Sequence, residues 1–304
     1  NISEMSLPDY LELLHKDDAR IQAQTQSGET INTFPSDSLS VPVNVAELSK
    51  SNWFPKAFLP FVSDRLGWRL PAKNIFKGEL VQLEIISNNA VSGWKRPIYF
   101  AATLPNDQYL GLKESMQLEG YAYRLMPFKI QGANDGFVNS KIMADNMLNK
   151  MYWRGLNDPS IYYHGDFYMG IPSVTLRLGT YRLADQLIRE GNIPLAKKVL
   201  DHLNFVMPDK VIPYDQFSAS MVGLYLSIGE DNKALEIANT MVKRNAKSLD
   251  YYLAAGVRSN ERNIQIAAYE MNLIVSSLKE SKLAPAKYKE LEGIFNFQMS
   301  KMQY

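Results

Sequence analysis

The first 135 residues contain short hydrophobic segments separated by polar, Pro-containing loops. In the segment 78–87 the apolar residues fit a buried helix stripe about as well as a strand. Two asparagines follow directly and are typical of a helix terminus, so we predict a helix there. A second helix is predicted over 6–14, where Ser6 is the expected cap and Pro8 lies in the first turn.

Extended structure is predicted in three other places. The segment 33–45 carries two prolines among β-branched residues, which favours an edge strand. The segment 97–102 is a short apolar run rich in strand-forming residues, and we interpret it as a buried strand. The segment 120–126 alternates Tyr and Leu with Ala, Arg and Met, which indicates a second strand. Together these elements predict a small α+β unit over residues 1–135.

From residue 136 onward the hydrophobic period is helical almost to the end of the chain. Five positions recur 38 residues apart, and each set marks a helix, a Gly-containing turn and a second helix: Ala184, Leu187, Gly191, Ala196 and Val199, then Val222, Tyr225, Gly229, Ala234 and Ile237. A third, looser copy is expected from Asp250 through a turn at Asn260, with Ala268 standing 34 residues after Ala234. A helical hairpin leaves one apolar face uncovered, so each hairpin is expected to cover its neighbour.

These periods are similar to those of tetratricopeptide-like repeats, although the Trp and Tyr signature positions of such repeats are incomplete here. We therefore predict an all-α array of tetratricopeptide-like hairpins over residues 136–304. A last helix over 287–302, opened by Pro285, is expected to cap the stack.

Composition and charge exclude several classes of protein. The chain has 33 Lys and Arg against 32 Asp and Glu, a balance that argues against a nucleic-acid or anionic-membrane surface. It has no cysteine, which excludes disulfides, zinc knuckles, iron–sulfur clusters and thiol catalysis. No apolar run approaches the length of a membrane-spanning helix. The first residue is Asn1 rather than Met, and we expect the chain to be a piece of a longer protein.

The sequence contains no recognisable catalytic constellation. His15, His164 and His202 lie far apart and outside any metal-binding spacing. There is no nucleophile elbow, no phosphate-binding loop and no dinucleotide fingerprint. We therefore predict no metal, no cofactor and no catalytic residue. One loop places Tyr163 and His164 beside Asp166, which leaves open either a hydrolase that uses Asp166 with His164 or an ordinary Gly-containing turn.

Several blocks of the chain resemble one protein family. Residues 93–101, here called the first signature block, read Gly-Trp-Lys-Arg-Pro-Ile-Tyr-Phe-Ala and are similar to an Asn-Trp-Lys-Arg-Pro-Ile-Tyr-Phe-Ala signature. Residues 118–127, the second signature block, resemble the block that follows it in the same family, and residues 146–155 and parts of 183–215 resemble later segments. The family consists of large polytopic membrane proteins of Bacteroidota. Their membrane half is a domain of unknown function related to protein O-mannosyltransferases of the C-type glycosyltransferase superfamily.

The resemblance implies that this chain is the C-terminal, extracytoplasmic part of an inner-membrane protein. The spanning helices and the catalytic carboxylate expected in that superfamily would then lie outside it. The expected function is a non-catalytic interaction domain that recruits a polypeptide or glycan acceptor, or that binds the membrane half of the same protein. The alternative is a free-standing periplasmic glycan- or peptide-binding protein.

Candidate binding residues come from the most specific blocks and from the loop described above: Arg96, Tyr99, Tyr123, Arg124, Trp153, Tyr163 and Asp166. Structural roles are the alternative for four of them. Tyr99 and Tyr123 are then packing residues, and Arg96 and Arg124 pair with nearby carboxylates.

Overall fold

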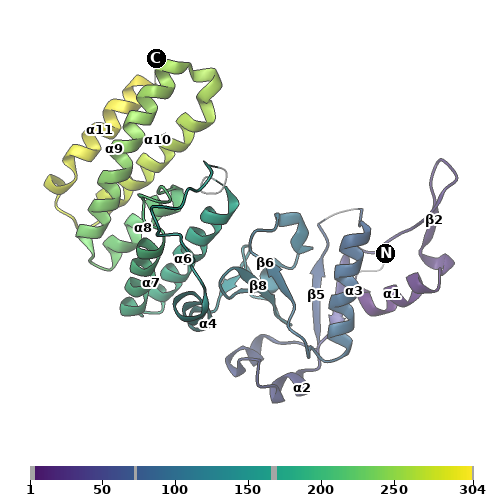
Figure 1. Cartoon of the computed structure of the whole chain (residues 1–304). Coiled ribbons are helices and arrows are strands. Elements are labelled where there is room, and N and C mark those ends of the chain that lie inside the picture. Colours follow the sequence, from purple (N-terminus) through teal and green to yellow (C-terminus); the bar gives the residue numbers. More distant parts are fainter. Residues whose placement is uncertain (1–3, 72–73, 166–169, 303–304) are drawn as a thin grey trace. The chain divides into compact units, whose positions relative to one another are not determined.

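The computed structural model describes residues 4–71, 74–165 and 170–302, and the chain divides into two compact units, Asn1–Asn139 and Ser140–Tyr304. The first unit combines small sheets with helices, whereas the regular structure described in the second is helical (Figure 1). The predicted fold class, an α+β unit followed by an all-α array, is confirmed.

The first sheet has three strands in the order β1-β4-β5: β1 Met5–Ser6, β4 Ser38–Pro42 and β5 Arg65–Arg69. The extended structure predicted within 33–45 is confirmed as β4, but its predicted position at an edge was wrong, because β4 pairs in parallel with β1 on one side and antiparallel with β5 on the other. The sheet tolerates Pro42 because β1 is short and pairs only with Leu39 and Ser40, so the proline lies beyond the two-sided part.

The largest sheet has four strands in the order β6-β8-β7-β9: β6 Tyr99–Ala101, β7 Met116–Leu118, β8 Ala122–Leu125 and β9 Phe137–Val138. The two strands predicted within 97–102 and 120–126 are confirmed as β6 and β8, and they pair antiparallel with each other. The prediction that the first of them is buried was wrong, because β6 lies at the edge of the sheet and Tyr99 and Ala101 are exposed. A hairpin of β2 Gln22–Gln24 and β3 Thr30–Asn32 forms the remaining sheet of the described residues.

The described residues of the first unit also form three α-helices: α1 Leu7–His15, α2 Val45–Lys50 and α3 Lys77–Val91. Both predicted helices are confirmed, as α1 and α3. Pro8 lies in the first turn of α1 as predicted, but the Ser6 side chain makes no capping hydrogen bond, and Ser6 is instead the last residue of β1. Helix α3 packs against α1 and β4 and buries Leu83 and Ile86. Short 3₁₀ turns connect these elements: η1 Ala19–Ile21, η2 Lys56–Phe61, η3 Asn106–Tyr109 and η4 Lys113–Ser115.

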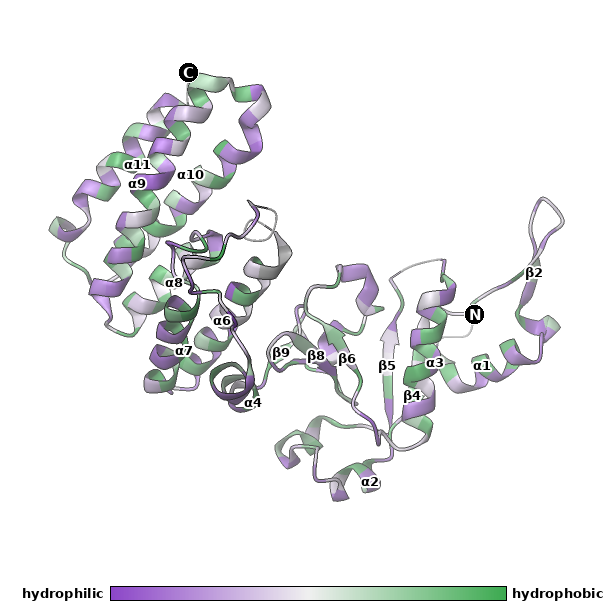
Figure 2. Cartoon of the chain, in the orientation of Figure 1, coloured by the Kyte–Doolittle hydropathy of each residue, from purple (hydrophilic) through white to green (hydrophobic). Residues whose placement is uncertain are grey.

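The second unit begins with α4 Ser140–Asp145, which continues into a π-helical turn, η5 Asn146–Lys150. Six longer helices follow in the part of this unit that the structure describes: α6 Ile171–Arg189, α7 Ile193–Val206, α8 Gln216–Ser227, α9 Asp231–Ala255, α10 Val257–Glu280 and α11 Lys289–Lys301. Hydrophobic and hydrophilic stretches interleave along α9 and α10, as expected for helices that bury one face each (Figure 2).

Helices α6 and α7 form one hairpin and α8 and α9 form another, and their turns are built alike. Gly191 has φ +76° and Gly229 has φ +79°, the left-handed region that favours glycine. The N–H groups of Gly191 and Asn192 donate to the carbonyls of Ile188 and Leu187 at 3.0 and 2.8 Å. The residues 38 positions further along make the same two bonds, at 3.1 and 2.9 Å. The other eight recurring positions are all buried: Ala184, Leu187, Ala196, Val199, Val222, Tyr225, Ala234 and Ile237.

The third copy does not follow the predicted pattern. Helix α9 runs for 25 residues to Ala255 and breaks at Gly256, which has φ +110°, so Asn260 lies inside α10 rather than in a turn. Ala267 is buried in α10, whereas Ala268 is only half-buried. The physical reason is that no glycine or proline interrupts α9 between Asp231 and Ala255, so the helix continues beyond the length of its counterpart α7.

The predicted last helix is confirmed as α11, which follows a 3₁₀ turn at η6 Pro285–Lys287 and packs on α9 and α10. Lys243 of α9 binds Glu290 at 2.9 Å and Lys301 binds Asp250 at 2.6 Å, so ion pairs at both ends of α11 supplement the apolar contact.

Candidate functional site

The first signature block ends α3 and begins β6. Gly93 and Trp94 both have positive φ, +86° and +58°, and they reverse the chain after the helix. The indole Nε1 of Trp94 donates to the carbonyl of Pro42 at 3.1 Å, and its ring is 3% exposed. Asn89 then binds the backbone of Arg96 twice, at 2.9 and 3.0 Å. The Arg96 side chain is exposed and makes no ion pair with any described residue. Trp94 and the Arg96 backbone therefore hold the fold at this point, while the Arg96 guanidinium lies in solvent.

Tyr99 and Arg124 meet in a polar cluster on one face of the four-stranded sheet. They stand opposite each other on β6 and β8, and Gln117 of β7 stands opposite Arg124 on the other side. The buried Glu119 carboxylate accepts hydrogen bonds from the Tyr99 hydroxyl at 2.9 Å and from the Gln117 amide at 2.6 Å. Arg124 Nη1 lies 4.0 Å from Glu119, and its guanidinium stacks on Trp53, 4.3 Å from the ring centroid. Burial, followed by the hydrogen bond to Glu119, raises the pKa of Tyr99.

Tyr123 lies on the opposite face of β8, because neighbouring residues of a strand point to opposite sides. Its ring is 5% exposed and packs edge-on against Tyr109 with centroids 5.6 Å apart. Lys113 Nζ lies over both rings, at 3.8 Å from Tyr109 and 4.7 Å from Tyr123. Tyr123 is therefore part of the core of the first unit rather than of its surface.

The remaining candidates belong to the second unit. Trp153 is half-buried, donates from Nε1 to the carbonyl of Met147 at 3.0 Å and packs edge-on against His202, 5.6 Å between centroids. Burial lowers the pKa of His202. Tyr163 is half-buried in the loop that follows. Asp166 lies outside the described residues, so its predicted pairing with His164 stays a prediction.

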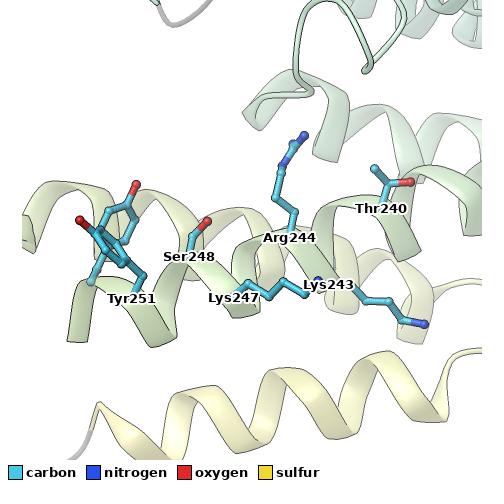
Figure 3. Close-up of a pocket in the computed structure, with 7 residues that line it drawn as sticks. Thr240, Lys243, Arg244, Lys247, Ser248 and Tyr251 are labelled. Atoms are coloured by element: carbon cyan, nitrogen blue, oxygen red, sulfur yellow. The ribbon is translucent and has the colours of Figure 1, made fainter. Parts of the chain in front are cut away.

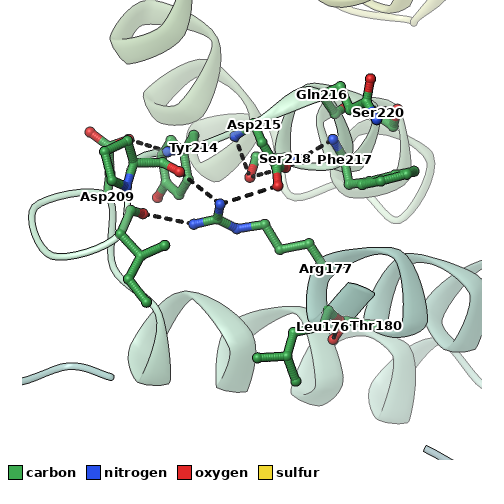
Figure 4. A network of polar contacts seen from close by, with 12 residues as sticks. Leu176, Arg177, Thr180, Asp209, Tyr214, Asp215, Gln216, Phe217, Ser218 and Ser220 are labelled. Atoms are coloured by element: carbon green, nitrogen blue, oxygen red, sulfur yellow. Dashed lines mark hydrogen bonds and ion pairs between the residues drawn. The ribbon is translucent and has the colours of Figure 1, made fainter. Parts of the chain in front are cut away.

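A fully buried arginine, Arg177 of α6, holds the segment that connects α7 to α8. Its Nη1 donates to the carbonyl of Pro213 and its Nη2 to the carbonyl of Ile212, both at 2.7 Å (Figure 4). The same Nη1 lies 3.3 Å from Oδ2 of Asp215. Asp215 also caps α8, since its Oδ1 accepts from two backbone N–H groups of the first helical turn.

A second arginine, Arg244 of α9, holds the same segment. Its Nη1 donates to Asp209 at 2.7 Å and its Nη2 to the carbonyl of Tyr214 at 2.8 Å. The positive charges of Arg177 and Arg244 are thus met by Asp215 and Asp209. The segment before α8 is consequently bound by side chains from two helices, α6 and α9.

This segment forms one wall of a pocket of about 720 Å³ that is also lined by α9, by α10 and by Val174 of α6. The lining combines apolar side chains, two tyrosines and polar or charged groups, some paired with each other and some not: Val174, Tyr214, Asp215, Gln216, Arg244, Asn245, Ser248, Tyr252, Arg262, Asn263, Ile266, Ala267 and Glu270. We call it the Glu270 pocket.

Glu270 is the buried carboxyl group of this pocket, with an exposed fraction of 7%. Its Oε2 accepts a hydrogen bond from Asn245 Nδ2 at 2.8 Å, and its Oε1 accepts none from the described residues. Burial raises the pKa of Glu270 to about 7, and the nearby negative charge of Asp215 adds to the effect.

A shallow groove of about 530 Å³ continues from the Glu270 pocket along α9. Both hollows share Arg244, Ser248 and Tyr252. Arg244 extends from one edge of this face of α9, and Lys243 and Lys247 extend from the other (Figure 3). The side chains of the groove recur at helical spacing and carry cations or hydroxyls: Thr240, Lys243, Arg244, Lys247, Ser248, Tyr251 and Tyr252. We call the pocket and this groove together the α9 groove.

Sequence reasoning missed the residues that build this site, although a signal was present. Asn245 and Glu270 lie on the buried faces of α9 and α10, where the helical period predicts apolar residues. Leu249 and Ile274, each one helical turn further along, are buried apolar residues on the same faces. Polar residues at such positions are unusual unless they are hydrogen-bonded. Among the described residues no cluster of three His, Asp or Glu side chains could hold a metal ion. The site offers hydrogen bonds, charge and aromatic surface.

The fold and site define a two-unit protein in which a small α+β unit precedes helical hairpins that carry a polar groove. Residues 1–143, just under half of the chain, match the family model described as TMEM260-associated domain 2. The matched segment contains both signature blocks, and the match is consistent with a domain of a TMEM260-like protein. No curated protein and no solved structure matches the chain. None of the helices that the structure describes is long and apolar enough to cross a membrane.

Proposed function

We propose that the chain is a non-catalytic, extracytoplasmic domain of a membrane-embedded, glycosyltransferase-like protein, and that its α9 groove recruits the acceptor polypeptide. The match of residues 1–143 to a TMEM260-associated domain supports the link to a protein related to O-mannosyltransferases. The Bacteroidota origin, the periplasmic location and the tetratricopeptide-like character of the hairpins belong to the same proposal.

The observation that carries the proposal is the unused hydrogen-bonding capacity of the α9 groove. The side chains of Gln216, Ser248 and Asn263 line the groove and make no hydrogen bond with any described residue. Amide and hydroxyl side chains both donate and accept, as the peptide group does, so they suit an extended backbone without specifying its side chains. From Thr240 to Tyr252 the helix rises about 18 Å, which is room for roughly five extended residues.

A glycan ligand is the second candidate, and one observation favours it. Tyr251 is 67% exposed and stands beside Tyr252 with ring centroids 5.7 Å apart. Exposed tyrosines provide flat apolar surface with a polar tip, which suits the face of a sugar ring.

Binding of randomised ligands separates the two candidates. A displayed library of random peptides and a glycan array are both applied to the purified chain and to the Lys247→Glu variant. Lys247 lies in the groove, is exposed and has no ion-pair partner among the described residues; Lys282 is likewise exposed but lies outside the groove, so Lys282→Glu is the matched control. We expect the wild type and Lys282→Glu to enrich the same peptide sequences. Lys247→Glu should enrich different sequences or none. Glycans enriched without peptides would instead support the second candidate.

Cell fractionation tests the membrane link. An antibody against this chain should detect a band several times heavier than 34.5 kDa that is released only by detergent. A soluble periplasmic band near the mass of the chain would refute the membrane-embedded protein and favour the free-standing binding protein.

A further inference from the structure

The Glu270 carboxyl group has no ion-pair partner among the described residues, so it adds an unmatched negative charge to the second unit when it ionises. The two buried or half-buried arginines beside it are each matched by an aspartate, Arg177 by Asp215 at 3.3 Å and Arg244 by Asp209 at 2.7 Å. The partner of Glu270 itself is the neutral amide of Asn245. Arg262, on the rim of the pocket, is exposed and makes no ion pair with any described residue. A buried carboxyl group without a cation is costly, and such groups are retained mainly where they have a partner.

The surroundings of Glu270 are suited to a cation that arrives on an apolar stem. Its unpaired Oε1 belongs to a pocket with apolar walls from Val174, Ile266 and Ala267. Tyr214 and Tyr252 line the same pocket, and aromatic rings attract cations to their faces. Lysine and arginine side chains have this construction, because an apolar stem carries a charged head.

We propose that the Glu270 pocket receives a basic side chain, lysine or arginine, of the polypeptide held in the α9 groove. This inference rests on the proposed function, because it specifies one position of the ligand that the groove is proposed to bind. The carboxylate supplies the counter-charge at the base of the pocket and Asn245 orients it. Arg177 pairs with Asp215 and Arg244 pairs with Asp209, so both arginines already have partners other than the Glu270 carboxylate.

Binding should depend on pH in a defined direction. The carboxyl group of Glu270 must ionise to attract a cation, and its pKa is raised to about 7. The charged groups that face it are Arg177 from α6, Arg244 from α9, Arg262 from its own helix and Asp215 at the start of α8. No histidine is among the described residues that line the pocket. The affinity for a basic peptide should therefore fall about tenfold between pH 8 and pH 6.

Fluorescence anisotropy with peptide pools tests the inference on the unmodified chain. Each nine-residue pool has one fixed central residue, Lys, norleucine, Arg or citrulline, and random flanking positions that exclude Lys and Arg. At pH 8 we expect the Lys or Arg pool to bind at least tenfold more tightly than its neutral counterpart. Equal binding of charged and neutral pools would overturn the inference and leave the groove as a peptide site. Failure of every pool to bind would overturn the proposed function as well.

A charge-removing variant assigns the preference to Glu270. Glu270→Gln keeps the size of the side chain and an acceptor for Asn245, so it should remove both the preference for basic pools and its pH dependence. Glu261→Gln removes one negative charge from the exposed side of the same helix and should leave both unchanged. A preference for basic pools that persists in a folded Glu270→Gln chain, checked by thermal melting, would assign the cation to another group.

Discussion

Arg96 and Arg124 stand in the two signature blocks, and their surroundings give them different roles. The Arg96 guanidinium is exposed, and the structure uses only the backbone of this residue, which binds Asn89. The Arg124 side chain is 13% exposed, stacks on Trp53 and lies beside the buried Glu119. A residue in a specific sequence block can therefore matter through its backbone in one case and through its side chain in the other.

Replacing these arginines by alanine should separate the two roles. Arg124→Ala leaves the buried Glu119 carboxylate without its nearby cation, and we expect a loss of about 2–4 kcal/mol in the free energy of unfolding. Arg96→Ala should change it by no more than about 0.5 kcal/mol. Chemical denaturation followed by circular dichroism measures both. Equal stability losses in the two variants would contradict the assignment.

Glu270 makes the stability of the second unit depend on pH. In the folded state burial raises its pKa from 4.5 to about 7, so the folded chain holds a proton that the unfolded chain releases. Stability is therefore lost as the pH rises from about 4.5 to 7 and is constant above that range. Relative to Glu270→Gln, wild-type stability should fall by about 2–3 kcal/mol between pH 5 and pH 8. Denaturation curves of both chains at these two pH values provide the measurement. If the free energy of unfolding changes equally in the wild type and in Glu270→Gln, Glu270 does not hold a proton in the folded state.

At the scale of elements, short segments with a clear local pattern were predicted correctly. The alternation of β8 is visible in the sequence of the strand itself. The apolar residues of α3 fit a strand about as well as a helix, and the helix was predicted correctly from the two asparagines that follow, which lie inside α3. The position of β4 in its sheet was predicted wrongly, because the number of neighbouring strands depends on Met5 and Arg65, which are distant in sequence. The boundary between α9 and α10 was also misplaced. The turn was predicted at Asn260 from a loose match to the repeat, whereas the helix ends at Gly256.

The two alike hairpin turns give a paired prediction. Gly191 and Gly229 have positive φ, and a Cβ atom at either would meet nothing within 4 Å, so alanine introduces backbone strain only. Gly191→Ala and Gly229→Ala should each reduce the free energy of unfolding by about 1 kcal/mol. Gly293 lies within α11 with equally open space but no positive φ, and Gly293→Ala should stabilise by about 0.5–1 kcal/mol. Urea denaturation of the three variants tests whether the two turns are equivalent.

At the scale of the whole molecule, each unit has a hydrophobic core of its own. Leu39 and Trp68 are buried in the first, and Met241 and Ile274 in the second. Units with separate cores are expected to fold separately. Residues 1–139 and 140–304, expressed as two chains, should each show a cooperative thermal transition and near-UV circular dichroism. A fragment without either signal would show that its core requires the other unit.

The sequence by itself determined the local elements and the change from an α+β unit to helical hairpins, because hydrophobic periodicity is set by residues a few positions apart. It also contained the signature blocks that resemble a known family. Only the tertiary structure decided which polar residues share a site. Arg177, Asn245 and Glu270 come from three helices and Asp215 from the cap of a fourth, spread over almost a hundred residues, and only packing brings these polar groups together. A periodic pattern marks the buried face of each helix, but it does not say which helix will cover that face.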